Sequence, residues 1–347
     1  MRQSRYILRP VGESDSPGIW DLVATIQDSL TSLPKDPDFL NRRILDSLRA
    51  FDPRVHRPGG EGYLFVLEDL RDRRIVGTSG ILSRVGGFDP FYTYEIRREK
   101  QAYAPLGIDV LLETLHLKKN HKGPTEICSL YLHPDHRAGG MGRLLSLARF
   151  LFMKSFPERF DHEVLAELRG FIDPEGHSPF WEAVGQKFFQ NDYYTADILS
   201  GVGEKAFIEA LMPRYPIYIS LLPESARAVI GRVHPHTEAA RGILLKEGFR
   251  ETSEVDIFDA GPILIARREA LRTWHFSRES PVQAGEPEAG VTALVSNGLL
   301  DFRATIGRVQ LEPDGSLLLG AELLEVLEIE PGQKACWLPM EGPLKSA

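Results

Sequence analysis

The glycine-rich segment Arg137-Ala138-Gly139-Gly140-Met141-Gly142 is the strongest chemical signal in the sequence. It lies between an expected strand over residues 126–132 and an expected apolar helix over residues 143–154. Glycines at such a junction let backbone N–H groups approach a phosphate closely, and the helix N-terminus favours an anion. The spacing of Arg137, Gly140 and Gly142 therefore predicts a site for a phosphate or pyrophosphate group, with a helix-capping turn as the alternative.

Two histidines could move protons or bind a metal. His234 and His236 stand two residues apart in an extended segment before an expected helix, so their side chains face the same side. Histidine is the commonest proton-transfer residue near neutral pH. No pattern of Cys, Asp or Glu completes a zinc site around them, so no metal site is expected. The spacing leaves open both a catalytic histidine and a surface histidine that caps the helix.

The remaining candidates for chemistry are weaker. His133 and His136 adjoin the glycine-rich segment and are expected in a turn beside the cofactor entrance, with metal binding as the alternative. Cys128 falls inside a strand and Cys336 inside an apolar β-like run, so both are expected as small buried residues. Without a suitable Cys or Ser motif, a covalent acyl-enzyme is not expected.

Composition narrows the class of protein. The 347 residues suggest about two domains, and 42% hydrophobic with 26% charged residues is typical of globular chains. The formal net charge of −8 argues against a general nucleic-acid-binding protein. Two cysteines cannot form a disulfide framework, and we find neither a signal peptide nor an apolar run long enough for a membrane. We therefore expect a cytoplasmic protein.

The elements that must position these residues are short strands mixed with helices. Strands are expected over residues 6–10, 63–67, 74–85, 126–132 and 164–172, and helices from 13–17 onward and over 143–154 and 179–189. The strands at 63–67 and 74–85 form an antiparallel hairpin. This order has few crossover helices, so it predicts an α+β protein with a mixed sheet rather than a doubly wound fold.

The chain divides into four segments. Residues 1–200 form the first domain, and residues 201–276 form a second unit with a helix over 238–247 and a strand over 255–258. The second unit partly echoes the first, which suggests a degenerate duplication. Residues 277–290 are rich in Pro, Gly, Gln and Glu and are expected to be a linker, before a small β-rich domain over residues 291–347.

Longer motifs carry a resemblance to a known family. They are Leu30-Thr31-Ser32-Leu33-Pro34, Gly62-Tyr63-Leu64-Phe65-Val66-Leu67-Glu68-Asp69, Glu167-Leu168-Arg169-Gly170, Ser178-Pro179-Phe180-Trp181 and Val233-His234-Pro235. Together they resemble the arginine N-succinyltransferase family of the GNAT superfamily, over roughly residues 5 to 340. Two departures fall in segments that could shape the amine pocket, Asp28-Ser29 and Ala260. The resemblance implies a GNAT-like first domain and a second, degenerate GNAT-like unit that carries His234.

The resemblance also implies a reaction. The family transfers the succinyl group of succinyl-CoA to the α-amine of L-arginine, which gives N2-succinyl-L-arginine and CoA and opens a route of arginine catabolism. On matching positions His234 is the proton donor and Leu130 contacts succinyl-CoA, with Arg137, Gly140 and Gly142 at the pyrophosphate. No permanently bound cofactor and no metal are implied, and neither nucleic acid nor membrane is a partner.

Several points stay open. The amine could be ornithine or another amine, the acyl group could differ, and the chain could be a non-catalytic CoA-binding subunit of a heteromer rather than a homodimer. Arg169 is a candidate for the succinyl carboxylate, with a structural salt bridge as the alternative. Asp256, Asp259 and Glu167 are unranked candidates for the guanidinium of the substrate.

Overall fold

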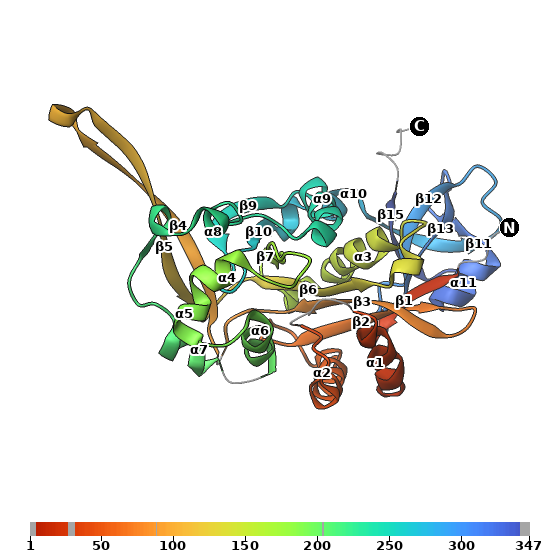
Figure 1. Ribbon diagram of the computed structural model, residues 1–347. Helices are drawn as coiled ribbons and strands as arrows, with labels where there is room; N and C mark the ends of the chain where they lie inside the picture. Colours follow the sequence, from red (N-terminus) through yellow and green to blue (C-terminus); the bar gives the residue numbers. More distant parts are fainter. Residues whose placement is uncertain (1–4, 27–31, 88, 203–204, 341–347) are drawn as a thin grey trace.

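A long mixed sheet with helices on both faces forms the body of the protein (Figure 1). The computed structural model describes residues 5–26, 32–87, 89–202 and 205–340. Asp28-Ser29 and the first two residues of the motif at 30–34 lie outside these ranges. The strands follow the order β12-β15-β11-β14-β13-β1-β2-β3-β6-β7-β10-β9-β4-β5-β8. The predicted α+β class with a mixed sheet is therefore confirmed.

The centre of the sheet contains the strands that the sequence predicts. They are β1 (Tyr6–Pro10), β2 (Gly62–Asp69), β3 (Arg74–Leu82), β6 (Thr125–Leu132) and β7 (Glu163–Glu167). From β1 to β6 each strand is antiparallel to its neighbour, and β7 is parallel to β6. The predicted hairpin is the β2–β3 pair. Strand β7 ends at Glu167 rather than at residue 172, because the chain leaves the sheet there.

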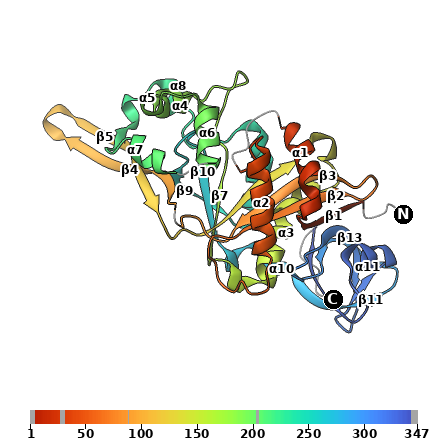
Figure 2. The ribbon, with the colours of Figure 1, turned by 90° about the horizontal axis from the view of Figure 1, so that it is seen from below.

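Helices cover the two faces of this central region. Helices α1 (Ser16–Ala24) and α2 (Pro37–Ala50) lie on one face and α3 (Met141–Ser155) on the other, as Figures 1 and 2 show. Residues on all sides of α3 are buried, among them Leu144, Leu147 and Leu151. A helix that is buried all round belongs to the core, so α3 is a fixed support for the end of β6.

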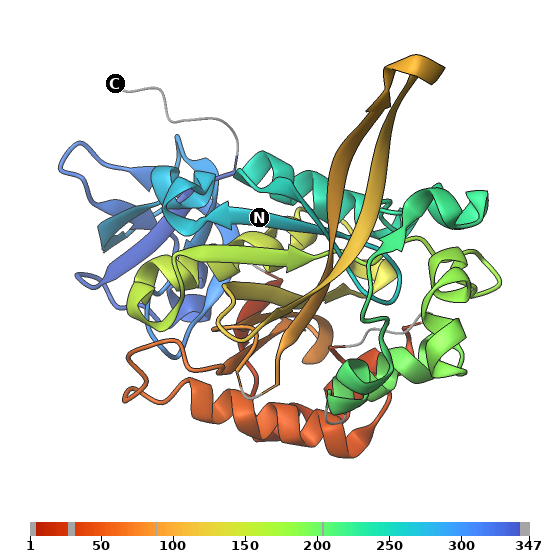
Figure 3. The ribbon, with the colours of Figure 1, turned by 90° about the vertical axis from the view of Figure 1, so that its left-hand side faces the viewer.

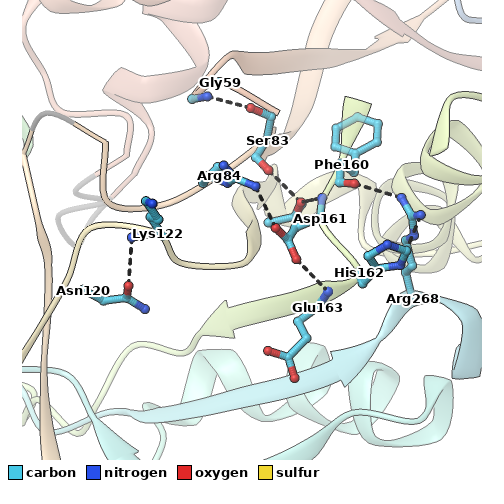
Figure 4. Close-up of polar contacts among 12 residues, drawn as sticks. Gly59, Ser83, Arg84, Asn120, Lys122, Phe160, Asp161, His162, Glu163 and Arg268 are labelled. Atoms are coloured by element: carbon cyan, nitrogen blue, oxygen red, sulfur yellow. Dashed lines mark hydrogen bonds and ion pairs between the residues drawn. The ribbon is translucent and has the colours of Figure 1, made fainter. Parts of the chain in front are cut away.

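A polar network holds the start of β7 against β6 and the end of β3. The hydroxyl of Thr125 donates to the Ser83 carbonyl (2.7 Å) and accepts the N–H of Asp161 (2.8 Å). Figure 4 shows Arg84 paired with Asp161 (3.0 Å) and Arg268 donating to the Phe160 carbonyl (2.9 Å). Strands β6 and β7 are therefore fixed to each other at this end.

Beyond this anchor the two strands diverge. Their register pairs only Thr125 with Val164 and Glu126 with Leu165. On its other edge β6 contains a bulge, where Ser129 and Leu130 stand opposite the single residue Ser79 of β3. A bulge disrupts the ladder and bends its strand, so β6 turns away from β7 and leaves an opening in the sheet.

A long hairpin is the element that the sequence analysis missed. Strands β4 (Phe91–Tyr103) and β5 (Ile108–Asn120) form a two-stranded arm that extends away from the body (Figure 3). Its outer residues are exposed and many are charged, with pairs such as Arg98–Glu113 across the strands. The inner half of each strand does alternate, over residues 92–97 and 115–118, and its apolar side chains pack against the body, so a usable signal was present there. Only the outer half lacks a buried face.

The remaining elements before residue 277 follow β7 in the chain. They are α4 (Pro179–Ala183), α5 (Gly185–Phe189), α6 (Tyr193–Val202), α7 (Ala206–Leu211), β8 (Ile217–Tyr218), α8 (Glu224–Arg227), α9 (Glu238–Glu247), β9 (Arg250–Val255), β10 (Pro262–Arg267) and α10 (Arg272–Phe276).

The predicted helix, strand and unit boundary between residues 200 and 258 have different outcomes. The helix predicted over 238–247 is confirmed as α9. The strand predicted over 255–258 is wrong, because Asp256 accepts the N–H groups of Phe258 (2.6 Å) and Asp259 (2.7 Å) and so closes a turn. The boundary expected at residue 200 falls inside α6. Strand β10 of the expected second unit pairs with β7 of the expected first domain, so the two share one sheet.

The C-terminal strands close into a small barrel. They are β11 (Arg278–Ala284), β12 (Val291–Ser296), β13 (Ala304–Leu311), β14 (Leu317–Leu319) and β15 (Lys334–Pro339), with α11 (Ala321–Leu327) packed beside them. The additional β12–β13 pairing closes the ring. The β-rich C-terminal domain is confirmed, but the linker predicted over 277–290 is wrong for β11, whose Ser280 and Val282 alternate into the core.

We expect Val282→Ala to lower the free energy of unfolding by about 2 kcal/mol, because it removes buried methyl groups from the barrel core. Val282 is 1% exposed, whereas its neighbour Gln283 is exposed. Urea unfolding of the two alanine variants measures the difference, and Gln283→Ala should change stability by less than about 0.5 kcal/mol. Equal stability of the two variants would mean that residues 278–284 are a linker after all.

Candidate functional site

A cavity of about 910 Å³ occupies the opening between β6 and β7. Its walls come from β6, the glycine-rich loop, the first turns of α3, the segment after β7 and the start of α9. All five residues that the sequence analysis proposed line it, namely Leu130, Arg137, Gly140, Gly142 and His234. The fold therefore brings together two motifs that lie far apart in the sequence.

The bulge in β6 shapes one wall. Ser129 has a left-handed backbone (φ 52°), which is uncommon for a residue with a side chain. Two contacts hold it: the Thr78 hydroxyl donates to its carbonyl (2.9 Å), and the Arg43 guanidinium donates to its hydroxyl (2.8 Å). The extra residue of a bulge is not paired by the ladder, so main-chain groups around Leu130 are available to a ligand in the cavity.

The glycine-rich loop forms the end of the cavity at the N-terminus of α3. Gly139 and Gly140 have positive φ values of 64° and 87°, so the turn needs residues without a Cβ atom. The Arg137 side chain folds back and donates to the Leu132 carbonyl (3.1 Å). The orphan N–H groups of the first helical turn and the helix dipole favour an anion at this end.

His234 is held from its backbone and its ring. Its N–H donates to the Arg169 carbonyl (2.8 Å), and Val233 forms a bridge with Gly170. Its Nδ1 accepts the N–H of His236 (3.2 Å), so the neutral ring carries its hydrogen on Nε2. His234 is buried and His236 is exposed, although both contribute to the cavity wall, as their spacing predicted.

Asp259 holds the segment 168–170, to which the backbone of His234 is hydrogen-bonded. Its carboxylate accepts the N–H groups of Gly170 and Gly261 (both 2.8 Å) and the hydroxyl of Tyr193 (3.3 Å). A Cβ atom on Gly261 would lie 2.0 Å from the Leu168 carbonyl oxygen, so the two loops approach each other more closely than any larger residue allows. The position of His234 therefore depends on a close contact between two loops.

Carboxyl groups are concentrated in the part of the cavity wall formed by the end of β7 and the turn at residues 256–259. Burial and the neighbouring Glu167 raise the pKa of Asp256 to about 7, and burial and Asp256 raise the pKa of Asp259 to about 8. Burial, with the charges of Glu126 and Asp259, also raises the pKa of Glu167. Like charges at close range favour the protonated forms, so this wall keeps protons that a bound cation would displace.

Comparison with known proteins agrees with this geometry. The family model described as "Arginine N-succinyltransferase beta subunit" matches residues 6–273, and the model of that family's C-terminal domain matches residues 278–339. The chain belongs to this family.

Individual relatives extend over nearly the whole chain. It is 42% identical over 330 residues to the "Arginine N-succinyltransferase" of Enterobacter sp. (strain 638), covering 94% of this chain and 95% of that protein. The protein of the same name from Escherichia coli (strain 55989 / EAEC) is 39% identical over 331 residues, covering 94% and 96%. The structure of "arginine/ornithine succinyltransferase subunit AI" from Pseudomonas aeruginosa matches with a TM-score of 0.89 at 35% identity, covering 97% and 99%.

The sequence analysis missed other residues of the cavity. Glu126, Tyr193 and Arg149 also line it, and Arg149 stands as a lone charge in the apolar run 144–153, which was a usable signal. His136 lies outside the lining, with its Nδ1 2.9 Å from the Tyr6 hydroxyl. Cys128 contributes to the cavity wall, and burial raises the pKa of its thiol.

Neither a metal cluster nor a membrane-spanning helix is present in the part of the chain that the structure describes. In residues 5–26, 32–87, 89–202 and 205–340 we find no group of three or more His, Cys, Asp or Glu arranged to hold a metal ion. Within the same ranges no helix has the length and apolar character needed to cross a membrane. The absence of a metal requirement stays a prediction.

The buried carboxyls predict a pH dependence of stability. Their pKa values are higher in the folded than in the unfolded chain, so the unfolded chain loses protons first and the free energy of unfolding falls between about pH 4 and pH 8. We expect Glu167→Gln to flatten this decline, measured by urea unfolding at several pH values. Glu163→Gln, at an exposed position of the same strand, is the control, and equal slopes for both variants would contradict the assignment.

Proposed function

We propose that this protein is an acyltransferase that transfers the succinyl group of succinyl-CoA to the α-amino group of L-arginine. The observation that carries the proposal is the convergence of the glycine loop, Leu130 and His234 on one cavity that is also lined by acidic residues. Family membership and the names of the relatives support the same reaction. The test is direct: the purified chain should release CoA from succinyl-CoA only when arginine is present.

The acyl-CoA would lie along the opening between β6 and β7. Its pyrophosphate would accept hydrogen bonds at the glycine loop, near Arg137, Gly140 and Gly142, and its thioester carbonyl would meet the backbone N–H near Leu130. A donor at that position stabilises the negative charge that develops on the carbonyl oxygen during attack. The bulge supports this role because it turns the main chain of β6 toward the cavity.

Transfer would proceed directly from thioester to amine. The neutral α-amine attacks the thioester carbon, the C–S bond breaks, and an amide forms. The attacking amine must lose one proton and the departing thiolate must take one up. His234 would give the hydrogen on its Nε2 to the sulfur and recover a proton from the ammonium group of the tetrahedral intermediate, so its ring is neutral before and after transfer. The contacts of His234 with Arg169 and of Val233 with Gly170 support this role, because they hold the backbone that carries the His234 ring at the cavity wall.

The acidic wall would receive the positive charge of the substrate. Asp259 already accepts two backbone N–H groups and a hydroxyl, and Asp256 accepts two N–H groups within its own turn. Glu167 makes no comparable backbone contact among the described residues, so it is the carboxyl best placed to turn toward a guanidinium. A bound cation would also relieve the repulsion among the three groups.

Ornithine is the second substrate to test, because the solved relative from Pseudomonas aeruginosa is named for arginine and ornithine. Both amino acids are cationic, so turnover with each must be compared at equal acyl-CoA. A homodimer, or a heteromer as the words "beta subunit" and "subunit AI" suggest for the relatives, stays a prediction, and so does the cytoplasmic location. A chain that binds CoA but turns over neither amine would be the non-catalytic subunit.

Gly142→Val tests the glycine loop without disturbing the fold. A Cβ atom at Gly142 would meet no atom within 4 Å, and the residue is helical, so thermal stability should change little. The added side chain would stand where the pyrophosphate approaches, so we expect CoA affinity to fall at least tenfold by calorimetry. Unchanged affinity in a folded variant would remove this loop from the binding site.

His234→Gln should lower turnover by about 10²–10⁴-fold while succinyl-CoA affinity stays within a few-fold, because glutamine can form hydrogen bonds but cannot donate a proton in this step. His236→Gln is the matched control. It keeps the main-chain N–H that His234 accepts, and its own ring is exposed. Equal losses in the two variants would show that His234 is not the proton donor.

A further inference from the structure

A buried guanidinium lines the cavity without a charged partner. Arg149 of α3 is only 2% exposed. Its Nε donates to the Ser146 carbonyl (3.2 Å), its Nη2 to the Ser146 hydroxyl (3.2 Å) and its Nη1 to the Cys128 carbonyl (3.4 Å). All three acceptors are neutral, and each Nη atom carries a second N–H. The group therefore has donors left for a ligand.

Such a charge is unusual inside a protein. Among residues 5–26, 32–87, 89–202 and 205–340 no carboxylate forms an ion pair with Arg149. By contrast Arg268, which is also buried, pairs with Glu269. Buried guanidinium groups are rarely left without a counter-charge, because removal from water penalises the ion. Burial accordingly lowers the pKa of Arg149 to about 10. An anionic group in the cavity would supply the missing charge.

The position of Arg149 shows which anion fits. Its guanidinium donates to the carbonyl and hydroxyl of Ser146, which lies roughly 6–9 Å along α3 beyond Gly140 and Gly142, since a helix rises about 1.5 Å per residue. From there its Nη1 reaches across to the carbonyl of Cys128, which precedes Leu130 by two residues, or roughly 6 Å along β6. A carboxylate at the end of a short acyl chain would reach this level when its thioester carbonyl lies at Leu130.

We propose that Arg149 binds the terminal carboxylate of the acyl group. It would thereby favour thioesters of CoA with one carboxyl group of a dicarboxylic acid, such as succinyl-CoA, over acyl-CoAs whose acyl group is neutral. This inference rests on the proposed function, because it assumes that the thioester lies at Leu130. Arg149 then contacts the substrate at the end remote from the bond that breaks. It determines acyl specificity rather than the chemistry of transfer.

Two other arginines are alternative ligands for the same carboxylate. Arg43 approaches the bulge from α2 and donates to the Ser129 hydroxyl (2.8 Å), and Arg169 lies on the cavity wall beside the His234 segment. Arg149 is the stronger candidate because it is almost fully buried, lines the cavity and donates only to neutral groups. The three positions can be separated by substitution.

The test compares succinyl-CoA with butyryl-CoA, which has the same chain length but ends in a methyl group. For Arg149→Met we expect kcat/KM with succinyl-CoA to fall about 100-fold or more, because a buried charge pair is lost. The value with butyryl-CoA should stay within about threefold of the wild type. The ratio of the two values is therefore the readout, and loss of folding alone would lower both together.

Control variants complete the experiment. Arg143→Met, at the pyrophosphate end of the cavity, should weaken both acyl-CoAs alike. Arg43→Met and Arg169→Met should leave the ratio unchanged. If Arg149→Met does not fold, Arg149→Lys keeps a charge and should lose roughly tenfold with succinyl-CoA alone, since lysine cannot bind a carboxylate through two parallel N–H groups.

The outcomes separate the two proposals. Equal losses with both acyl-CoAs in the Arg149 variants, or a selective loss in Arg43→Met or Arg169→Met, would overturn the assignment of Arg149 and leave the transferase function standing. A wild-type chain that turns over succinyl-CoA and butyryl-CoA equally would do the same. A wild-type chain that turns over no acyl-CoA with any amine would overturn both proposals.

Discussion

The divergence of β6 and β7 is the constraint on which the site depends. The two strands are fixed together at Thr125 and Glu126 by the network around Asp161, and the bulge at Ser129–Leu130 then bends β6 away. Two parallel strands that stayed paired would fill the sheet and leave no opening. Because they separate, the glycine loop after β6 lines one side of the gap. The residues after β7, to which the His234 segment is bound, line the other.

Close packing between loops fixes the second half of the site. The turn at Asp259–Gly261 presses against the segment Leu168–Gly170, and Asp259 joins them through backbone N–H groups. The backbone of His234 donates to Arg169 of that segment, and its neighbour Val233 forms a bridge with Gly170. A small shift of either loop would therefore move the ring, so we regard Asp259 as part of the support of His234 rather than as a ligand for substrate.

The cavity is electrostatically incomplete without its proposed substrates. One wall carries the carboxyls of Glu167, Asp256 and Asp259, which burial and mutual repulsion keep protonated to unusually high pH. Another part carries the guanidinium of Arg149, whose protein contacts are neutral. A cationic amino acid would compensate the charge of the carboxyls, and an anionic acyl group would compensate the charge of Arg149. The same charges would then orient the amino acid and the acyl group relative to each other.

The sequence by itself determined the elements and motifs that depend on neighbours along the chain. The β2–β3 hairpin, helices α3 and α9 and the glycine loop were predicted because apolar periodicity and turn residues act over a few positions. The family resemblance also pointed to His234 and Leu130, whose roles stay a prediction. Only the tertiary structure decided that these residues meet in one cavity, because long-range strand pairing sets the distance between them. The raised carboxyl pKa values likewise arise from burial, which no spacing of residues records. The lone charge of Arg149 is visible in the sequence, but only the fold places it in the cavity.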